Sequence, residues 1–234
     1  MLHLCGTAQM ADLIDILVVG AGPAGANAAL AAARHGKHVV LLDEQVKPGG
    51  QIWRAKDSSI LSAPQTPESS AGDALRAKIT KAQIDHRGST RIWQIERQSE
   101  GWDVHVLRDG QVERLTTKAL VLATGAHEFV QPIPGWTKPG VFGLAGATAL
   151  FKQNLSPLGQ HTIVSGTGPL VFFVASEIRR LGGKVAAVVT PYTRRDWVAK
   201  LPALAGRVDL AFRGALWIAN LMMTQVPIFW SCSV

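Results

Sequence analysis

The sequence predicts an α/β protein in which parallel strands alternate with helices and a small antiparallel β-meander is inserted between them. An apolar strand, a glycine-rich turn and an Ala-rich helix occur in succession near the N-terminus, and a similar succession returns about 146 residues later, at Gly166 instead of Gly20. Between the two, alternating stretches joined by turn residues indicate the meander, at about residues 90–118.

The first strand–turn–helix succession has the spacing of a dinucleotide-binding fingerprint. An apolar strand over residues 15–19 precedes a G-x-G-x-x-G motif, and a helix over residues 24–34 follows it. The motif comprises Gly20, Gly22, Pro23, Ala24 and Gly25. Gly20 permits a tight turn, Gly22 lets the backbone approach a pyrophosphate, and Gly25 lets the helix pack closely on the strand. The free N–H groups at the helix N-terminus favour phosphate, so a Rossmann-like nucleotide site is expected here.

Two acidic residues follow the second predicted strand, residues 38–42. Asp43 lies 23 residues beyond Gly20, close to where the fingerprint places an acid that hydrogen-bonds the adenosine ribose. Asp43 is therefore the preferred ribose ligand and Glu44 the alternative. A chance acidic residue at a strand end is the competing interpretation.

A turn with two glycines comes next. Gly49 and Gly50 permit a sharp turn whose backbone can lie against a ligand, and the amide of Gln51 offers both a donor and an acceptor. A plain surface turn is the alternative interpretation.

The elements between this turn and the second motif follow from periodicity and turn residues. They are a loop over residues 55–72, a helix over 74–84, meander strands over 90–96, 102–107 and 111–116, an apolar strand from residue 119 that ends in Ala123, Thr124 and Gly125, a Pro/Gly-rich crossover, and a helix over 145–154.

The second motif is less complete than the first. Gly166 and Gly168 follow a strand over residues 161–164, but Val171 occupies the place of the third glycine, and no acid follows the next strand. A purely structural βαβ unit is therefore the alternative to a nucleotide site. The uncharged residues 214–230 are too short and too often interrupted by polar residues for a membrane span, and predict a buried helix followed by a strand.

Taken in order, the motifs Gly20–Gly25, Gly49–Gln51, Ala123–Gly125 and Gly166–Gly168 resemble those of the two-dinucleotide-binding flavoproteins, the superfamily of pyridine nucleotide-disulfide and related oxidoreductases. The resemblance implies FAD as the cofactor, with NAD(P) as a possible second nucleotide at Gly166 and Gly168. It also implies that Gly49, Gly50, Gln51 and Ile52 lie on the flavin side of FAD and that Ala123, Thr124 and Gly125 close the FAD site.

A narrower resemblance rests on Asp43–Arg54 and on the segments Pro132–Trp136 and Pro139–Val141. These are similar to the FAD-containing subunit of bacterial multi-subunit amino-acid and opine oxidases and dehydrogenases. The implied function is hydride transfer from the CH–NH group of an amino acid or opine to flavin and on to an acceptor, within a hetero-oligomer that binds a small-molecule substrate. No catalytic acid or base is assigned.

The resemblance implies an N-terminal extension over residues 1–14, an FAD-binding domain over 15–157 and an NAD(P)-type unit over 158–234 that is incomplete. The segment that completes the FAD domain in the family is not found, so a truncated or split product is expected. Such a chain retains FAD poorly and exposes apolar surface. The alternative function is therefore a non-catalytic remnant or a nucleotide-binding assembly piece.

Composition excludes several other classes of protein. Cys5 and Cys232 lie near opposite ends, so the chain has neither the redox pair of a disulfide reductase nor a cysteine cluster for a metal. The net charge of +7 is not accompanied by basic residues interleaved with aromatics in a nucleic-acid-binding fold. No metal, nucleic acid or membrane span is expected, and the protein is expected in the cytoplasm, or at the inner membrane through its partners.

Overall fold

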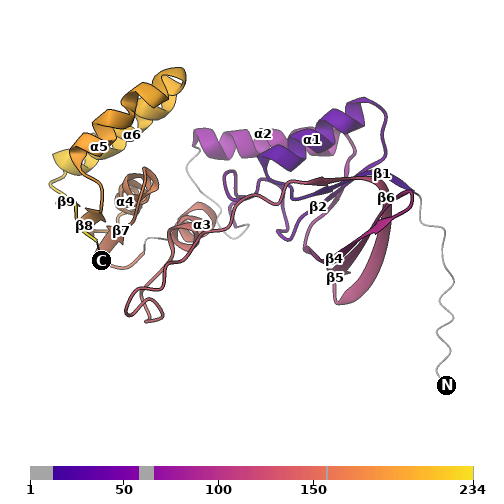
Figure 1. Ribbon diagram of the computed structural model, residues 1–234, viewed down its shortest axis with the longest axis horizontal. Coiled ribbons are helices and arrows are strands. Elements are labelled where there is room, and N and C mark those ends of the chain that lie inside the picture. The colour runs from indigo at the N-terminus through magenta and orange to yellow at the C-terminus, as the bar shows by residue number, and fades with distance from the viewer. Residues whose placement is uncertain (1–12, 58–65, 157, 234) are drawn as a thin grey trace. The chain divides into compact units, whose positions relative to one another are not determined.

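The computed structural model describes residues 13–57, 66–156 and 158–233, which divide into two compact units (Figure 1). The first unit contains described residues up to 55 and from 66 to 126, and the second contains residues 56 and 57 and those from 127 onward. The expected extension over residues 1–14 lies outside the described part except for its last two residues. The expected domain boundary at 157/158 stays a prediction.

The first unit is a six-stranded mixed sheet with two helices. Its elements are β1 (Ile14–Val19), α1 (Pro23–Arg34), β2 (Val39–Leu42), α2 (Pro67–Lys81), β3 (Asp85–Arg87), β4 (Thr90–Gln98), β5 (Gly101–Arg108) and β6 (Gln111–Leu122). The strand order is β3-β2-β1-β6-β5-β4. The pairs of β1 with β2 and β6, and of β2 with β3, are parallel, whereas β4, β5 and β6 pair antiparallel. The α/β class with an inserted meander is thus confirmed.

The central strands β1 and β2 contact side chains on both faces of the sheet, which is why they are nearly continuous apolar runs rather than alternating ones. One face packs against α1 and α2, with Val18 and Leu41 in contact with helix residues such as Ala29 and Leu75. The opposite face, with Leu17 and Val40 among its residues, packs against the meander. Figure 1 shows both helices on one side of the sheet and β4 and β5 on the other. This layering fixes the carboxyl ends of β1 and β2 in relation to α1.

The strand β6 corrects the sequence analysis, because it runs without a break through the two strands expected over 111–116 and from 119. Its first half pairs with β5 and its second half with β1, and Thr117 pairs with both Trp102 and Ile14. The fully buried Thr117 hydroxyl donates to the carbonyl of Ile14 (3.1 Å). The meander is therefore an extension of the nucleotide-binding sheet.

Helix α2 also differs from the expectation. It begins at Pro67, inside the stretch predicted as a loop, and ends at Lys81 rather than near residue 84. Thr66 and Ser69 form a reciprocal capping box, and Pro67 occupies the first helical position, so the sequence does carry a start signal. Residues 58–65 of the predicted loop lie outside the described part. The short polar strand β3 was not predicted.

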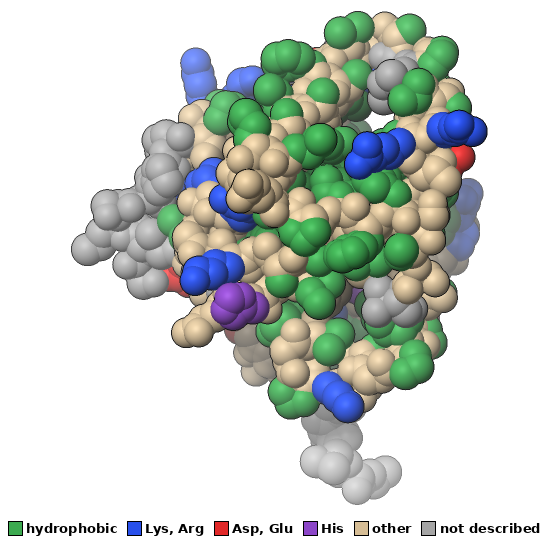
Figure 2. Space-filling model, turned by 90° about the vertical axis from the view of Figure 1, so that its left-hand side faces the viewer, with side chains coloured by type: hydrophobic (Ala, Val, Ile, Leu, Met, Phe, Trp, Pro, Cys, Tyr) green, Lys and Arg blue, Asp and Glu red, His purple; other side chains and the backbone are tan. Residues whose placement is uncertain are grey.

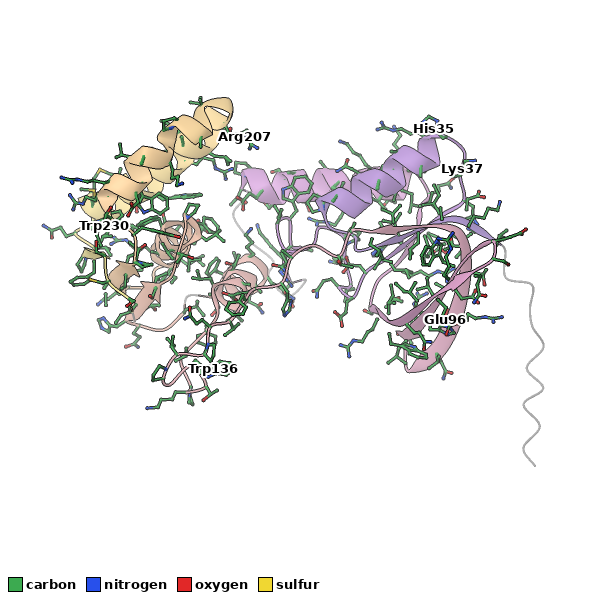
Figure 3. The ribbon with its side chains drawn as sticks, viewed as in Figure 1. His35, Lys37, Glu96, Trp136, Arg207 and Trp230 are labelled. Atoms are coloured by element: carbon green, nitrogen blue, oxygen red, sulfur yellow. The ribbon has the colours of Figure 1, made fainter. Side chains whose placement is uncertain are left out.

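The second unit is a three-stranded parallel sheet with helices. Its elements are α3 (Leu144–Asn154), β7 (Thr162–Ser165), α4 (Leu170–Arg180), β8 (Val185–Thr190), α5 (Arg194–Lys200), a 3₁₀-helix (Leu201–Arg207), α6 (Val208–Met223) and β9 (Ile228–Trp230). The strand order is β7-β8-β9. Phe151, Phe172 and Ile178 are among the largest buried side chains of its core. Trp136 lies in the loop that precedes α3, in the Pro/Gly-rich segment, and Arg207 and Trp230 flank α6 (Figure 3).

Helix α6 corrects the expectation of a buried helix. Leu221 is buried and Trp217 and Ile218 pack against the core, but Phe212 and Met223 are 63% and 77% exposed. Figure 2 shows hydrophobic side chains gathered on this side of the molecule, with Lys and Arg side chains among them. Among the described residues, α6 therefore packs with one side against the core and leaves other apolar side chains exposed.

Candidate cofactor site

The glycine motif forms the turn between β1 and α1, and two of its glycines are required by close packing. Gly20 has φ +96°, and a Cβ there would lie 2.3 Å from the carbonyl oxygen of Ala123. A Cβ at Gly25 would lie 1.9 Å from the carbonyl oxygen of Gly20. No side chain can replace either hydrogen without moving the backbone. The absence of a side chain at these two glycines therefore allows β1, α1 and the end of β6 to pack closely against one another.

Gly22 has a different environment from Gly20 and Gly25, the other two glycines of the motif. A Cβ there would meet only the Cα of Gly50, at 3.9 Å, so the protein leaves open space beside this backbone. Gly22 is also the N-cap residue of α1, with Pro23 in the first turn and no acidic residue in that turn. The helix N-terminus therefore retains its positive dipole end and N–H groups that lie within reach of a phosphate.

Asp43 follows β2 and contacts the glycine turn directly. Its Oδ2 accepts a hydrogen bond from the backbone N–H of Ala21 (2.5 Å), and its Oδ1 accepts from the N–H of Gln45 (2.6 Å). Glu44 is exposed and forms an ion pair with Arg91 (2.6 Å). A carboxylate has about four lone-pair sites, so Asp43 can still accept from a ribose hydroxyl while it holds the turn.

The two adjacent glycines lie in a turn over residues 48–53, which we name the diglycine turn. Gly49 and Gly50 have φ values of +135° and +57°, a region that favours glycine. The N–H of Gly49 donates to the carbonyl of Ala21 (2.8 Å). A Cβ at Gly50 would lie 2.8 Å from the Cα of Gly22, so the turn crosses the glycine motif backbone to backbone.

The end of β6 closes the arrangement. The N–H of Ala123 donates to the carbonyl of Val19 (2.8 Å), and the side-chain amide of Gln51 donates to the carbonyl of Ala126 (3.1 Å). Gly125 has φ +79° with open space at its Cβ position, and Thr124 and Ile52 are exposed. Within the first unit, the motifs from Gly20, Asp43, Gly49 and Ala123 thus converge at the carboxyl end of the parallel strands, where ligands bind in open α/β sheets.

The second glycine motif lies in the second unit. The N–H of Gly166 donates to the carbonyl of Val189 (3.2 Å), and Gly168 has φ +80°. A Cβ at Gly166 would lie 3.2 Å from Cγ1 of Val171, which is fully buried. Val171 therefore fills the position of the third glycine. The strand β8 ends in the buried Thr190, where the first unit has Asp43 after β2.

Two functional candidates escaped the sequence analysis. Arg76 on α2 donates from Nη1 to the carbonyls of Pro48 (2.8 Å) and Trp53 (3.1 Å), at the two ends of the diglycine turn. Glu128 accepts from the N–H groups of Leu144 (2.6 Å) and Ala145 (3.0 Å), and so caps α3. Both contacts join residues far apart in the sequence, and no local pattern marks them.

The site defines a dinucleotide-binding α/β protein, and comparison with known proteins gives its family. The family model described as pyridine nucleotide-disulphide oxidoreductase matches residues 14–205. The chain belongs to this family. This membership places the chain in an oxidoreductase family and confirms FAD as the expected cofactor, and it is compatible with NAD(P) as a second nucleotide.

Curated relatives and solved structures agree with this assignment. The chain is 35% identical over 178 residues to an opine oxidase subunit of Agrobacterium tumefaciens, covering 73% of this chain and 35% of the relative. It is 31% identical over 227 residues to hydrogen cyanide synthase subunit HcnB of Pseudomonas aeruginosa, covering 93% and 47%. The fold is similar to that of L-proline dehydrogenase from P. horikoshii, with a TM-score of 0.65, 23% identity, and coverage of 78% of this chain and 36% of that one. The chain thus spans between about a third and a half of these relatives.

Two other kinds of feature bear on the function of the described residues. None of the described helices has the length and apolarity needed to cross a membrane. The described residues also contain no cluster of three or more His, Cys, Asp or Glu side chains that could hold a metal ion. Cys232 is an exposed free cysteine, and Cys5 lies outside the described part.

Proposed function

We propose that this chain is the FAD-binding part of an oxidoreductase subunit that oxidises the CH–NH group of an amino acid or opine. The observation that carries the FAD assignment is the backbone crossing of the diglycine turn and the glycine motif. Gly22 and Gly50 face each other with no side chain on either, and the N-terminus of α1 lies beside them. This bare backbone fits the pyrophosphate of a dinucleotide, because a Cβ on Gly22 would enter the open space beside it, and a Cβ on Gly50 would push the two backbones apart.

The residues divide the binding of FAD between them. The N-terminus of α1 and Gly22 bind the pyrophosphate, Asp43 accepts from the adenosine ribose, with Glu44 as the alternative, and the diglycine turn with Gln51 orients the flavin side. Ala123, Thr124 and Gly125 bound the site at the end of β6. When bound, FAD supplies the hydride acceptor that side chains lack.

The substrate class rests on the relatives' names. The relatives from opine oxidase and hydrogen cyanide synthase are both named as subunits, and the solved structure with a similar fold is named as an L-proline dehydrogenase. We assign this chain the same class of substrate, an amino acid or opine, and partner subunits in a cytoplasmic hetero-oligomer. Gly166 and Gly168 form the candidate NAD(P) loop, weakened by Val171.

A second candidate function is an assembly piece without catalytic activity. The exposed apolar side chains of α6 favour it, because such a surface suits contact with another polypeptide. The two candidates differ in one measurable property: the first requires stoichiometric FAD and the second does not.

The test uses the full chain and a pair of glycine variants. Gly22→Ala adds a Cβ in open space beside the proposed FAD site. Gly214→Ala is the control, because it also adds a Cβ in open space, but on α6. We expect FAD titration, followed by quenching of flavin fluorescence, to saturate at one FAD per chain for the wild type and Gly214→Ala. Gly22→Ala should remain folded, with only the small loss of stability expected for alanine at an N-cap, yet bind FAD at least about tenfold more weakly, a change of about 1.4 kcal/mol.

Absence of saturable FAD binding by the wild type would overturn the flavin assignment and leave the assembly piece. The substrate class is tested separately, on the chain loaded with FAD. Anaerobic addition of an opine or amino acid should bleach the visible absorption of the bound flavin. Bleaching by dithionite but by no CH–NH compound would contradict the substrate class alone.

A further inference from the structure

Arg76 lies on α2, outside every nucleotide-binding motif, yet its guanidinium contacts both ends of the diglycine turn. One nitrogen, Nη1, donates to the carbonyls of Pro48 (2.8 Å) and Trp53 (3.1 Å). The other, Nη2, forms an ion pair with Asp73 (2.8 Å) one turn earlier on the helix. The guanidinium thus bridges the first and last residues of the turn.

The helix that carries Arg76 is firmly attached to the sheet. Leu75 and Ile79 are buried in the core between α1 and the parallel strands, and the capping box at Thr66 fixes the start of α2. The Arg76 side chain is only 19% exposed. A hydrogen bond from a charged donor is stronger than one from a neutral donor, but competing water weakens it. Because little of the Arg76 side chain is exposed to water, its bonds to the two carbonyls are expected to be strong.

The packing around Arg76 leaves room for this contact and for little else. Gly72 lies one turn before Arg76, and a Cβ there would be 3.1 Å from the Cβ of Trp53. A Cβ at Gly49 would be 2.1 Å from the carbonyl oxygen of Trp53. The glycines at positions 49 and 72 therefore allow the turn to fold back under α2, where its terminal carbonyls meet the guanidinium.

The Arg76 contact adds to the bonds that hold the diglycine turn against the rest of the site, from the N–H of Gly49 to Ala21 and from the amide of Gln51 to Ala126. Among the described residues, the backbone bond from the N–H of Trp53 to the carbonyl of Gly49 (3.0 Å) closes it internally. Gly49 and Gly50 have maximal backbone freedom, so the unfolded turn has many conformations to lose. Two partly buried carbonyls that converge on one cation would be left without a partner if that cation were removed.

We propose that Arg76 is a positioning residue of the cofactor site, which holds the diglycine turn in the shape that FAD requires without contacting FAD itself. This inference rests on the proposed function, since it gives the turn its ligand. The pathway of the effect runs from Arg76 through the carbonyls of Pro48 and Trp53 to Gly50 and Gln51, which face the glycine motif and the end of β6.

The variants separate this contact from the rest of α2. Arg76→Met removes the donors and keeps the aliphatic stem, whereas Arg76→Lys keeps the charge but cannot reproduce the planar fork. Asp73→Asn removes the ion pair and leaves both carbonyl bonds in place. Lys78→Met is the matched charge control on an exposed position of the same helix.

Two measurements on the full chain are read together. The first is hydrogen–deuterium exchange without FAD, in which Arg76→Met should speed exchange at residues 49–53 and leave β1 and α1 unchanged. The second is the FAD titration, in which Arg76→Met should weaken binding at least about tenfold, the value of one hydrogen bond to a charged group. The visible circular dichroism of the bound flavin should change as well. Arg76→Lys should be intermediate, and Asp73→Asn and Lys78→Met should match the wild type.

The outcomes distinguish this inference from the proposed function. If the wild type does not bind FAD, the flavin assignment is overturned, and the role given to Arg76 is overturned with it. This holds even if Arg76→Met speeds hydrogen exchange in the turn. If Arg76→Met shows the same hydrogen exchange in the turn as the wild type, or the same FAD affinity, the inference about Arg76 alone is overturned. Faster exchange throughout α1, α2 and β1 would mean that Arg76 supports the fold in general and not this turn, and would also overturn it.

Discussion

The carboxylate of Asp43 lies 2.5 Å from the backbone nitrogen of Ala21 and accepts its hydrogen bond, which joins the end of β2 to the centre of the glycine motif. The same carboxylate also accepts from the N–H of Gln45. Glu44, the next residue, points instead to Arg91 in an exposed ion pair. Two adjacent acidic residues therefore have separate tasks before any ligand binds.

Replacing these two acids should have different effects on stability. Asp43→Ala leaves the N–H groups of Ala21 and Gln45 without their acceptor and should lower the free energy of unfolding by about 2 kcal/mol. Glu44→Ala removes an exposed ion pair and should cost no more than about 0.5 kcal/mol. Urea unfolding followed by tryptophan fluorescence measures both changes.

The same two variants test the ribose assignment. With Asp43 as the ribose ligand, Asp43→Ala should weaken FAD binding by more than Glu44→Ala, and Asp43→Asn should retain part of the affinity through its remaining acceptor oxygen. FAD titration followed by flavin fluorescence measures the order. A larger loss of affinity in Glu44→Ala would transfer the ribose role to Glu44 and leave Asp43 as a support of the glycine motif.

Two helical glycines should respond in opposite ways to alanine. Gly25→Ala places a Cβ 1.9 Å from the carbonyl of Gly20, so the turn must shift and the chain should lose about 3 kcal/mol or fail to fold. Gly146→Ala, inside α3 with open space around it, should gain about 0.5–1 kcal/mol from higher helix propensity. Thermal unfolding compares the two. Equal effects would mean that the packing at Gly25 is not the constraint.

Glu128 should stabilise α3 from a distance. Its carboxylate accepts from Leu144 and Ala145, the first two residues of the helix, where a negative charge also suits the helix dipole. Glu128→Ala should cost about 1 kcal/mol, as for the loss of an N-cap, and Glu128→Gln less. Glu100→Ala, in the exposed turn between β4 and β5, is the control. Helix content from circular dichroism and the unfolding midpoint should fall in the first variant and stay constant in the control.

Stability should depend on pH through His86 on β3. Burial lowers the pKa of His86 below the ordinary value of 6.5, although Asp43 and Asp85 oppose the shift and Arg108 adds to it. Because the unfolded chain then binds a proton more readily than the folded one, this contribution is complete above pH 6.5 and is lost as the pH falls below that value.

The measurement is the unfolding midpoint between about pH 7 and pH 5, the interval in which an ordinary histidine changes its charge. His86→Gln should flatten the decline in that interval, whereas His161→Gln, at an exposed position of the second unit, should leave it unchanged. An equally steep decline in His86→Gln would assign the pH dependence to other groups.

The sequence by itself determined the nucleotide-binding motifs and the order of most elements, because these follow from local chemistry. The glycine spacing from Gly20 to Gly25 and the apolar runs in β1 and β2 are recognised from residues that are close together in the chain. The family resemblance also followed from motif order and is confirmed by the family match over residues 14–205. The cofactor roles of individual residues stay predictions.

Only the tertiary structure decided how these pieces support one another. Thr117 joins the meander to β1, Arg76 reaches the diglycine turn, and Glu128 caps α3, each through contacts between residues 16 to 103 positions apart. Such contacts depend on where the folded chain returns in space, and no periodicity or spacing records this. The same reason explains why Asp43 could be chosen as an acid of the site from its position, while its bond to Ala21 could not.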